Sequence, residues 1–208
     1  MDISVGRRAF RITAVEDQDL LLENSDRVAQ FPFGFLLWES AVELARRILV
    51  SPILVSGRRV LEIGAGVGVA GIAAAVAGAH CCQTDHQEGA LALARRNATQ
   101  NGVSGIRQFT ADWNAWAHDD RYDVLIAADI TYDRAAHAPL KHIFETNLEP
   151  GGRVILSDPC RPQTLDFVAR LEKLGWAVDV EVCPVERLGV ARHAERVEIA
   201  IFSLTRQP

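Results

Sequence analysis

The chain has 208 residues, of which 49% are hydrophobic, and this length is enough for one substantial core. Its formal net charge of −5 argues against a general electrostatic attraction to nucleic acid or to anionic membranes. We expect a single domain over 1–208, with 1–52 decorating a core at 53–208 and with neither nucleic acid nor membrane as a partner.

The first fifty residues predict a small decoration of this core. Residues 9–14 and 19–23 are expected to form a short hairpin, and an aromatic-rich segment follows at 31–35. A helix is expected from about residue 36, because apolar residues then recur at helical spacing, and Pro52 should end it. Trp38 would lie on the apolar face of this helix.

From residue 60 onward, segments with strand and helix patterns alternate along the chain. The expected strands are 60–63, 80–84, 106–111, 122–128, 153–157, 177–185 and 196–204. The expected helices are 67–77, 88–101, 139–148 and 163–174. Such alternation predicts an α/β fold with a doubly wound, seven-stranded sheet that is mostly parallel. Because no helical pattern separates the last two strands, they should pair as an antiparallel hairpin at one edge.

The four cysteines, Cys81, Cys82, Cys160 and Cys183, show no C-x-x-C spacing and are expected to be free thiols in a reducing compartment. The N-terminus has no apolar signal segment, and the longest apolar stretch is too short to span a bilayer. We therefore expect a cytoplasmic protein. The histidines show no ligand spacing with each other or with the cysteines, so no metal site is expected.

The most informative segment is 60–71, V-L-E-I-G-A-G-V-G-V-A-G, a short apolar strand that runs into four glycines at the start of a helix. Glycines let backbone N–H groups approach a ligand, and a helix N-terminus favours anions. A tight turn without a ligand is the alternative, but the position between strand and helix favours binding. The segment fits both the G-x-G-x-x-G of dinucleotide sites and the E-x-G-x-G-x-G of S-adenosylmethionine enzymes.

Asp85 ends the second strand of the core, where its carboxylate can accept hydrogen bonds from ribose hydroxyls; capping the next helix is the alternative. Both NAD and S-adenosylmethionine contain this ribose. A short-chain dehydrogenase would need Tyr-x-x-x-Lys, and neither Tyr122 nor Tyr132 has a lysine four residues on. Glu62, an acid inside a strand, calls for a cationic partner, and the ammonium of S-adenosylmethionine would supply one.

Polar and aromatic residues also follow the next two strands. Asp112 and Trp113 suit an adenine, as acceptor and ring, although a surface acid beside a core tryptophan is the alternative. Asp129 and Tyr132 form a D-x-x-Y where open α/β sheets present reactive groups, and the alternative for Asp129 is a helix cap. Trp38 is expected to be a core residue that can also face a sulfonium cation.

Together these motifs resemble the class I, seven-strand S-adenosylmethionine-dependent methyltransferases, which have a Rossmann-like fold. More narrowly, the chain resembles the protein lysine methyltransferase group that contains the electron-transfer-flavoprotein β-subunit enzyme and its bacterial relatives. The resemblance runs from about Phe31 onward and rests on P-F-G-F-L-L-W, V-L-E-I-G-A-G-V-G, T-D, A-D-W, D-x-x-Y and S-D-P-C-R-P. In the last segment these relatives carry glycine where this chain has Cys160.

The resemblance implies roles for individual residues. Glu62, Gly64, Gly66 and Asp85 would hold the methionine and ribose, and Asp112 and Trp113 the adenine. The full set of expected cofactor contacts is Trp38, Glu62, Gly64, Ala65, Gly66, Gly68, Asp85, Asp112, Trp113 and Asp129. Asp129 and Tyr132 would also face the methyl acceptor as the catalytic pair. An N-P-P-Y signature is absent, because Ile130 and Thr131 replace both prolines, and this favours an aliphatic amine as acceptor.

The expected function is therefore an S-adenosylmethionine-dependent N-methyltransferase acting on lysine side chains of a protein partner, with S-adenosylhomocysteine as product. The same chemistry on a small amine or a protein histidine is the first alternative. A non-catalytic S-adenosylmethionine-binding interaction module is the alternative from another class, and a dehydrogenase comes last.

Overall fold

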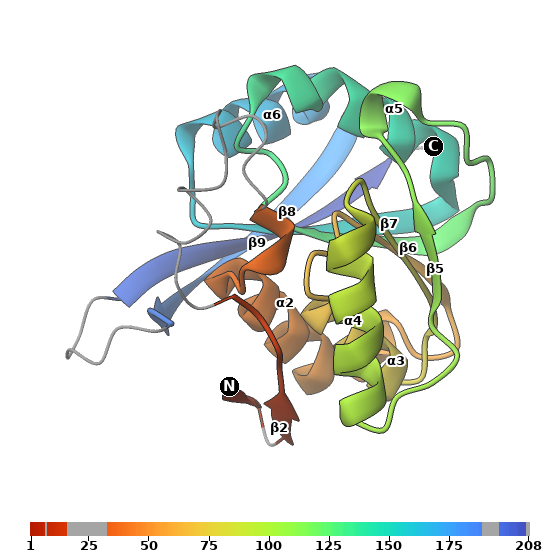
Figure 1. Cartoon of the computed structure of the whole chain (residues 1–208). Helices are drawn as coiled ribbons and strands as arrows, with labels where there is room; N and C mark the ends of the chain where they lie inside the picture. The colour runs from red at the N-terminus through yellow and green to blue at the C-terminus, as the bar shows by residue number, and fades with distance from the viewer. Residues whose placement is uncertain (7, 16–32, 189–195, 207–208) are drawn as a thin grey trace, which may run out of the picture.

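The computed structural model describes residues 1–6, 8–15, 33–188 and 196–206. Within these residues, helices cover both faces of a central sheet (Figure 1). The strands of this sheet are β3 (Arg59–Ile63), β4 (His80–Asp85), β5 (Arg107–Thr110), β6 (Tyr122–Ala128), β7 (Leu148–Asp158), β8 (Trp176–Glu186) and β9 (Arg196–Arg206). The α-helices are α2 (Glu39–Val50), α3 (Val69–Val76), α4 (Glu88–Gln100), α5 (His137–Asn147) and α6 (Pro162–Lys173).

The sheet has the strand order β5-β4-β3-β6-β7-β9-β8. The first five strands of this order are parallel, and β9 pairs antiparallel with both β7 and β8. The expected seven-stranded, doubly wound sheet with an antiparallel edge hairpin is therefore confirmed. Because β3, β4, β6 and β7 are parallel, their carboxyl ends meet at the same edge of the sheet.

The central strands are buried on both faces, which explains their apolar sequences. In β6, Val124 and Ile126 pack in a cluster with side chains of α2 and α3, whereas Leu125 and Ala127 pack in a cluster with α5 and α6. All four residues have no exposed surface. A strand covered on both sides reads as a continuous apolar run, and each large side chain buried here contributes about 1.5–3 kcal/mol.

The N-terminal hairpin differs from the expected one. Strand β1 (Asp2–Val5) pairs antiparallel with β2 (Arg8–Arg11), so the strand expected at 9–14 is the second arm of an earlier hairpin. After β1, Gly6 adopts a positive φ of 62°, which glycine permits without steric cost. The strand expected at 19–23 lies outside the described residues.

The expected helix at residue 36 begins later, at Glu39. Residues Phe33–Phe35 form a short 3-10 turn, η2, and Trp38 precedes the helix in an extended conformation with φ −107° and ψ 142°. The sequence predicted Trp38 on the apolar face of the helix, and this was wrong. Trp38 is the residue that directly precedes the helix. Of the aromatic segment, residues 31 and 32 lie outside the described residues.

The other expected boundaries agree with the structure to within two residues, except that β7 begins five residues earlier than expected. The extra residues include Leu148, which pairs with Tyr122 across a register shift in the ladder between β6 and β7. None of the helices formed by the described residues has the length and apolar character that crossing a membrane requires.

Candidate active site at the carboxyl ends of the strands

A pocket lies where β3, β4 and β6 end, and η2 and the start of α2 form its opposite wall. Its lining includes most of the residues that the sequence predicted for the site. These are Trp38, Glu62, Gly64, Ala65, Gly66, Asp85, Trp113, Asp129 and Tyr132. The fold therefore brings together around one pocket residues that lie almost a hundred positions apart in the chain.

Two of the predicted cofactor contacts are not part of this lining. Gly68 precedes α3 with φ 85°, and a Cβ there would lie 2.7 Å from the Cβ of Ala94 in α4. Asp112 is exposed and accepts a 2.9 Å hydrogen bond from the backbone N–H of Asn114, which caps the 3-10 turn η4 (Trp113–Ala115). In this structure Gly68 serves close packing and Asp112 serves capping.

The glycine loop between β3 and α3 is shaped by close contacts. Gly64 has φ 68°, and a Cβ there would lie only 2.7 Å from Cγ2 of Ile130. Gly66 has φ 52°, and its N–H donates a 2.9 Å hydrogen bond to Oδ2 of Asp85. The loop therefore needs glycine both for its backbone conformation and for space, and it exposes backbone to the pocket.

Glu62 is almost fully buried, with 4% of its surface exposed. Its carboxylate accepts a 2.7 Å hydrogen bond from Nε2 of Gln83 and another from the N–H of Gly71, in the first turn of α3. Burial raises the pKa of Glu62 to about 7, although these two donors oppose the rise. The sequence predicted a cationic partner, and the partners that the structure provides are two neutral donors. A bound cation at this position would favour the ionised carboxylate.

Asp85 is held in place by backbone donors. Besides the N–H of Gly66, its carboxylate accepts a 3.0 Å hydrogen bond from the N–H of Gln87. His86 Nδ1 lies 3.3 Å from Oδ1, and this hydrogen bond raises the pKa of His86. Each carboxylate oxygen has two lone pairs, so Asp85 retains acceptor capacity toward the pocket. This arrangement suits a ligand with hydroxyl donors.

Aromatic rings form two walls of the pocket. Trp113 packs against the glycine loop, since a Cβ on Gly64 would lie 3.2 Å from its Cζ2. On the other side, the ring of Phe33 lies 5.5 Å from that of Tyr132 and 6.2 Å from that of Trp38. Trp38 Nε1 donates a 3.2 Å hydrogen bond to the carbonyl of Phe33, which fixes the orientation of the indole.

Asp129 directly follows β6 and adopts a left-handed conformation with φ 57°. Its N–H donates a 3.0 Å hydrogen bond to the carbonyl of Ser157 in β7. The side chain is 9% exposed, and burial raises the pKa of its carboxyl group. Asp tolerates this backbone region better than most residues, so the turn can aim a carboxylate into the pocket.

The loop that carries Tyr132 is held in place by contacts of Thr131 with α5 and α6. The hydroxyl groups of Thr131 and Thr164 lie 2.7 Å apart, and Nε2 of the buried His137 lies 3.0 Å from the carbonyl of Thr131. Tyr132 itself is 43% exposed. The loop is therefore anchored to α5 and α6, while its tyrosine remains accessible at the mouth of the pocket.

The sequence analysis missed Arg161, which forms an ion pair with Asp129. Arg161 belongs to the segment S-D-P-C-R-P that supports the family resemblance, but no role was assigned to it. The sequence carried a partial signal, because the segment stands at the end of an expected strand, but that this strand, β7, lies beside β6 is shown by the structure. In the same segment Cys160 has φ 58°, a conformation that favours glycine.

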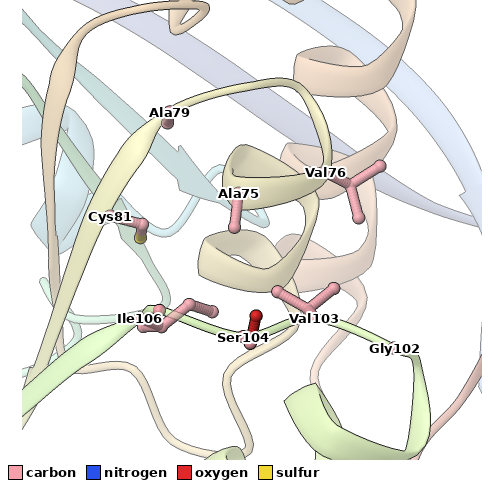
Figure 2. Close-up of a pocket in the computed structure, with 9 residues that line it drawn as sticks. Ala75, Val76, Ala79, Cys81, Gly102, Val103, Ser104 and Ile106 are labelled. Atoms are coloured by element: carbon pink, nitrogen blue, oxygen red, sulfur yellow. The ribbon is translucent and has the colours of Figure 1, made fainter.

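A second cavity, of about 310 Å³, lies at the opposite edge of the sheet. Its walls come from the end of α3, the start of β4 and the loop before β5, as Figure 2 shows for Val76, Cys81 and Val103. None of its lining residues is charged. Within the described ranges, no group of three His, Cys, Asp or Glu side chains is placed to hold a metal ion.

A family model described as lysine methyltransferase matches residues 16–173, which is more than half of the chain. The chain belongs to the lysine methyltransferase family. This agrees with the resemblance inferred from the motifs, and S-adenosylmethionine is the methyl donor that such a family uses.

Individual relatives are similar to this chain over about two thirds of its length. The electron transfer flavoprotein beta subunit lysine methyltransferase of Danio rerio is 30% identical over 141 residues, covering 67% of this chain and 54% of the relative. The histidine protein methyltransferase 1 homolog of Dictyostelium discoideum is 26% identical over 149 residues, covering 68% and 48%. The chain thus spans about half the length of the curated relatives it matches.

Solved structures of methyltransferases share the fold at lower sequence identity. A precorrin-6y C5,15-methyltransferase from Geobacter metallireducens is 16% identical with a TM-score of 0.65, covering 79% of this chain and 88% of that one. A ribosomal protein L11 methylase from Lactobacillus delbrueckii subsp. bulgaricus is 22% identical with a TM-score of 0.57, covering 81% and 77%. These similarities confirm the Rossmann-like methyltransferase fold.

Proposed function

We propose that this member of the lysine methyltransferase family is an S-adenosylmethionine-dependent N-methyltransferase that acts on lysine side chains of a protein. The observation that carries the proposal is the pocket at the strand ends, in which Glu62, Asp85 and Asp129 are presented by three neighbouring strands. Family membership and the lysine methyltransferase relatives support the choice of lysine.

The residues of the pocket fit S-adenosylmethionine. We assign Glu62 to the methionine ammonium, because a buried carboxylate with neutral donors gains from an added cation. We assign Asp85 to the ribose hydroxyls, because it lines the pocket and its carboxylate retains acceptor capacity. Trp113 lines the same pocket and offers an aromatic face to the adenine. Gly64 and Gly66 let the backbone approach the cofactor closely.

We assign Asp129 and Tyr132 to the methyl acceptor. They line an adjoining cavity of about 180 Å³ together with Phe33, Trp38 and Arg161, and this cavity shares four lining residues with the pocket assigned to the cofactor. A carboxylate among aromatic rings attracts an ammonium group by charge and by cation–π contact. S-adenosylmethionine supplies a methyl group on a sulfonium, which the lone pair of the amine attacks in line as the sulfur–carbon bond breaks.

The transfer requires a neutral amine, and the ammonium proton must leave to solvent first. A free lysine has a pKa of about 10.4, so populating its neutral form at pH 7 costs about 4.6 kcal/mol. The work of the protein residues is therefore to orient the amine, to exclude competing water and to make this proton easier to remove. The buried cysteines, Cys81 and Cys82, are free thiols, which supports a reducing, cytoplasmic setting for the reaction.

Calorimetric titration with S-adenosylhomocysteine and, separately, with NAD tests the cofactor. The proposal expects binding of S-adenosylhomocysteine and none of NAD. Tight binding of NAD without binding of S-adenosylhomocysteine would overturn it and would favour a dehydrogenase.

The acceptor is tested by incubating the protein with a labelled methyl donor and a cell lysate, before and after protease treatment of that lysate. A protein substrate takes up label only in the untreated lysate, and mass spectrometry of the labelled peptide identifies the residue. Label on lysine supports the proposal, whereas label on histidine or on a small molecule replaces it with one of the alternatives. A protein that binds S-adenosylhomocysteine but transfers no label fits the non-catalytic module.

A further inference from the structure

Arg161 lines the acceptor cavity and connects two carboxylates, that of Asp129 in the cavity lining and that of the buried Asp158. Its Nη1 pairs with Oδ1 of Asp129 and lies 2.8 Å from Oδ2 of Asp158. Its backbone N–H donates a further 2.7 Å hydrogen bond to Oδ1 of Asp158. The two acids directly follow or end neighbouring parallel strands, since Ala128 of β6 pairs with Ser157 of β7. One guanidinium is thus shared between them.

The burial of this cluster makes its charge count important. The side chain of Asp158 is fully buried, that of Asp129 is 9% exposed and that of Arg161 is 30% exposed. Two carboxylates and one guanidinium carry a net charge of −1 when all are ionised. One bound ammonium brings the cluster to neutrality, so the cavity suits a single cationic group.

Asp129 alone would hinder methyl transfer while helping binding. A carboxylate beside the acceptor stabilises its ammonium form, and opposite charges within about 4–6 Å shift a pKa by about 1–3 units. This shift would add to the cost of removing the proton. A second cation that shares the charge of Asp129 acts in the opposite direction, because like charges disfavour each other.

We propose that Arg161 is a positioning residue that controls the protonation of the acceptor amine, by holding Asp129 in place and withdrawing part of its negative charge. This inference rests on the proposed function of the same site. Arg161 lines the acceptor cavity and is directly paired with the carboxylate assigned to the amine, so its charge acts on both. The pairing lowers the pKa of Asp129 against the stronger effect of burial.

Other ionisable groups face the cavity from the surrounding elements. Tyr132 stands at the mouth, and burial raises its pKa, so it stays neutral at physiological pH. Asp85 at the end of β4 and Asp133 beyond Tyr132 add negative charge at greater distance. Arg161 is the cation that contacts Asp129 within the described residues. The protonation equilibrium of the acceptor amine is therefore set mainly by the charges of Asp129, Asp158 and Arg161.

A purely structural role is the competing explanation. Arg161 is the N-cap residue of α6, and its contacts with Asp158 anchor that helix to β7. Loss of an anchor lowers the amount or the rate of active enzyme by a similar factor at every pH. Loss of a charge that acts on the amine moves the pH dependence instead. The two roles therefore predict different curves.

The pH profile of kcat distinguishes them, measured with the labelled acceptor protein found in the lysate test. Arg161→Gln should move the acidic limb of the profile to higher pH by about one unit or more. Arg161→Lys keeps the positive charge, so its acidic limb should lie close to that of the native enzyme. Arg134→Gln is the matched control, because Arg134 pairs with Asp166 at an exposed position and should leave the limb in place. A lower rate without any movement of the limb would overturn the inference.

A second measurement needs no acceptor. The Asp129 carboxyl group can be titrated by carbon-13 NMR in the native protein and in both variants. Its pKa should be higher by about one unit or more in Arg161→Gln, which lacks the positive charge, and close to the native value in Arg161→Lys, which keeps it. An unchanged pKa would overturn the inference even where a variant has little activity. If the native enzyme transfers no methyl group while this titration shows the shift, the proposed function fails and the coupling between Arg161 and Asp129 stands.

Discussion

The backbone of Gly71 in α3 lies directly against the carboxylate of Glu62 in β3. A Cβ atom on Gly71 would overlap Oε2 of Glu62 and Nε2 of Gln83. The N–H of Gly71 also donates a hydrogen bond to Glu62, which places the buried acid at the N-terminal end of a helix, where negative charge is favoured. Gly71 therefore permits the close helix-to-sheet contact on which the geometry of the pocket depends.

Replacing Gly71 should destabilise the protein although it improves helix propensity. Gly71→Ala gains about 1 kcal/mol of propensity but forces overpacking that costs about 1–3 kcal/mol. We expect a net loss of about 1 kcal/mol in the free energy of unfolding, measured by urea denaturation. In a double-mutant cycle, Gln83→Ala should relieve part of this loss, because it removes the side chain that the new Cβ meets. A variant as stable as the native protein would mean that α3 can shift without cost.

Glu62 should make the stability of the ligand-free protein fall with rising pH. Its pKa is about 7 in the folded state and about 4.5 as a model value for the unfolded chain. The folded state therefore binds more protons between these values, and stability is highest below about 4.5 and is lost as the pH rises to about 7. The effect amounts to up to about 3 kcal/mol.

Glu62→Gln removes this titration. Near pH 4.5 the free energy of unfolding of the variant should be similar to that of the native protein. At pH 8 it should be higher by at least about 1 kcal/mol, as measured by urea denaturation at both pH values. The same variant should bind S-adenosylhomocysteine about tenfold more weakly, because the partner of the ammonium is lost. A difference in stability that does not change with pH would show that Glu62 titrates normally in the folded state.

The adenine wall can be tested through Trp113. Trp113→Ala should weaken binding of S-adenosylhomocysteine by about tenfold, since a ring–ring contact contributes about 0.5–1.5 kcal/mol beyond its buried area. Trp113→Phe keeps an aromatic face and should retain most of the affinity, which makes it the matched control. Isothermal calorimetry gives both values. Equal affinity of Trp113→Ala and the native protein would place the adenine elsewhere in the pocket.

The sequence predicted the central sheet well because local pattern and burial agree there. Strand β6 is expected and observed at the same residues, since a strand covered on both faces is apolar throughout. The N-terminal region was less predictable. The helix was expected to begin near residue 36, yet Trp38 is extended and the helix begins at Glu39, after η2. Gly34 of η2 lies against the glycine loop, since a Cβ on Gly66 would be 3.2 Å from its carbonyl oxygen, and no local pattern in the sequence reports such a long-range contact.

In the candidate site, too, some features could be predicted from the sequence and others could not. Glu62, Asp85 and Asp129 could be found from the sequence because each stands at or near the end of a recognisable strand. The pairing of Arg161 with Asp129 could not be found from the sequence. It depends on β6 and β7 being neighbours in the sheet and on the positive φ of Asp129. Trp38 lines the pocket, but it does so from an extended position before α2 and not from the helical face that the sequence predicted.

The acceptor role that we propose for Asp129 makes the strongest prediction about activity. Asp129→Asn keeps the size of the side chain and removes its charge, so the amine loses its counterion and Arg161 loses a partner. We expect turnover to fall by about a hundredfold or more, while the affinity for S-adenosylhomocysteine changes by less than about threefold. Asp166→Asn is the matched control, because Asp166 pairs with Arg134 on the surface and should leave turnover unchanged.

The test is specific because it compares the turnover of the variant with its affinity for S-adenosylhomocysteine. A collapse of the fold would reduce turnover and cofactor affinity together, whereas loss of an acceptor contact reduces turnover alone, because the cofactor pocket is held by Glu62, Asp85 and the glycine loop. Turnover is measured with the labelled donor, and affinity by calorimetry on the same preparation. Unchanged turnover in Asp129→Asn would remove Asp129 from the mechanism, and with it the reason for a charge on Arg161 to act on the amine.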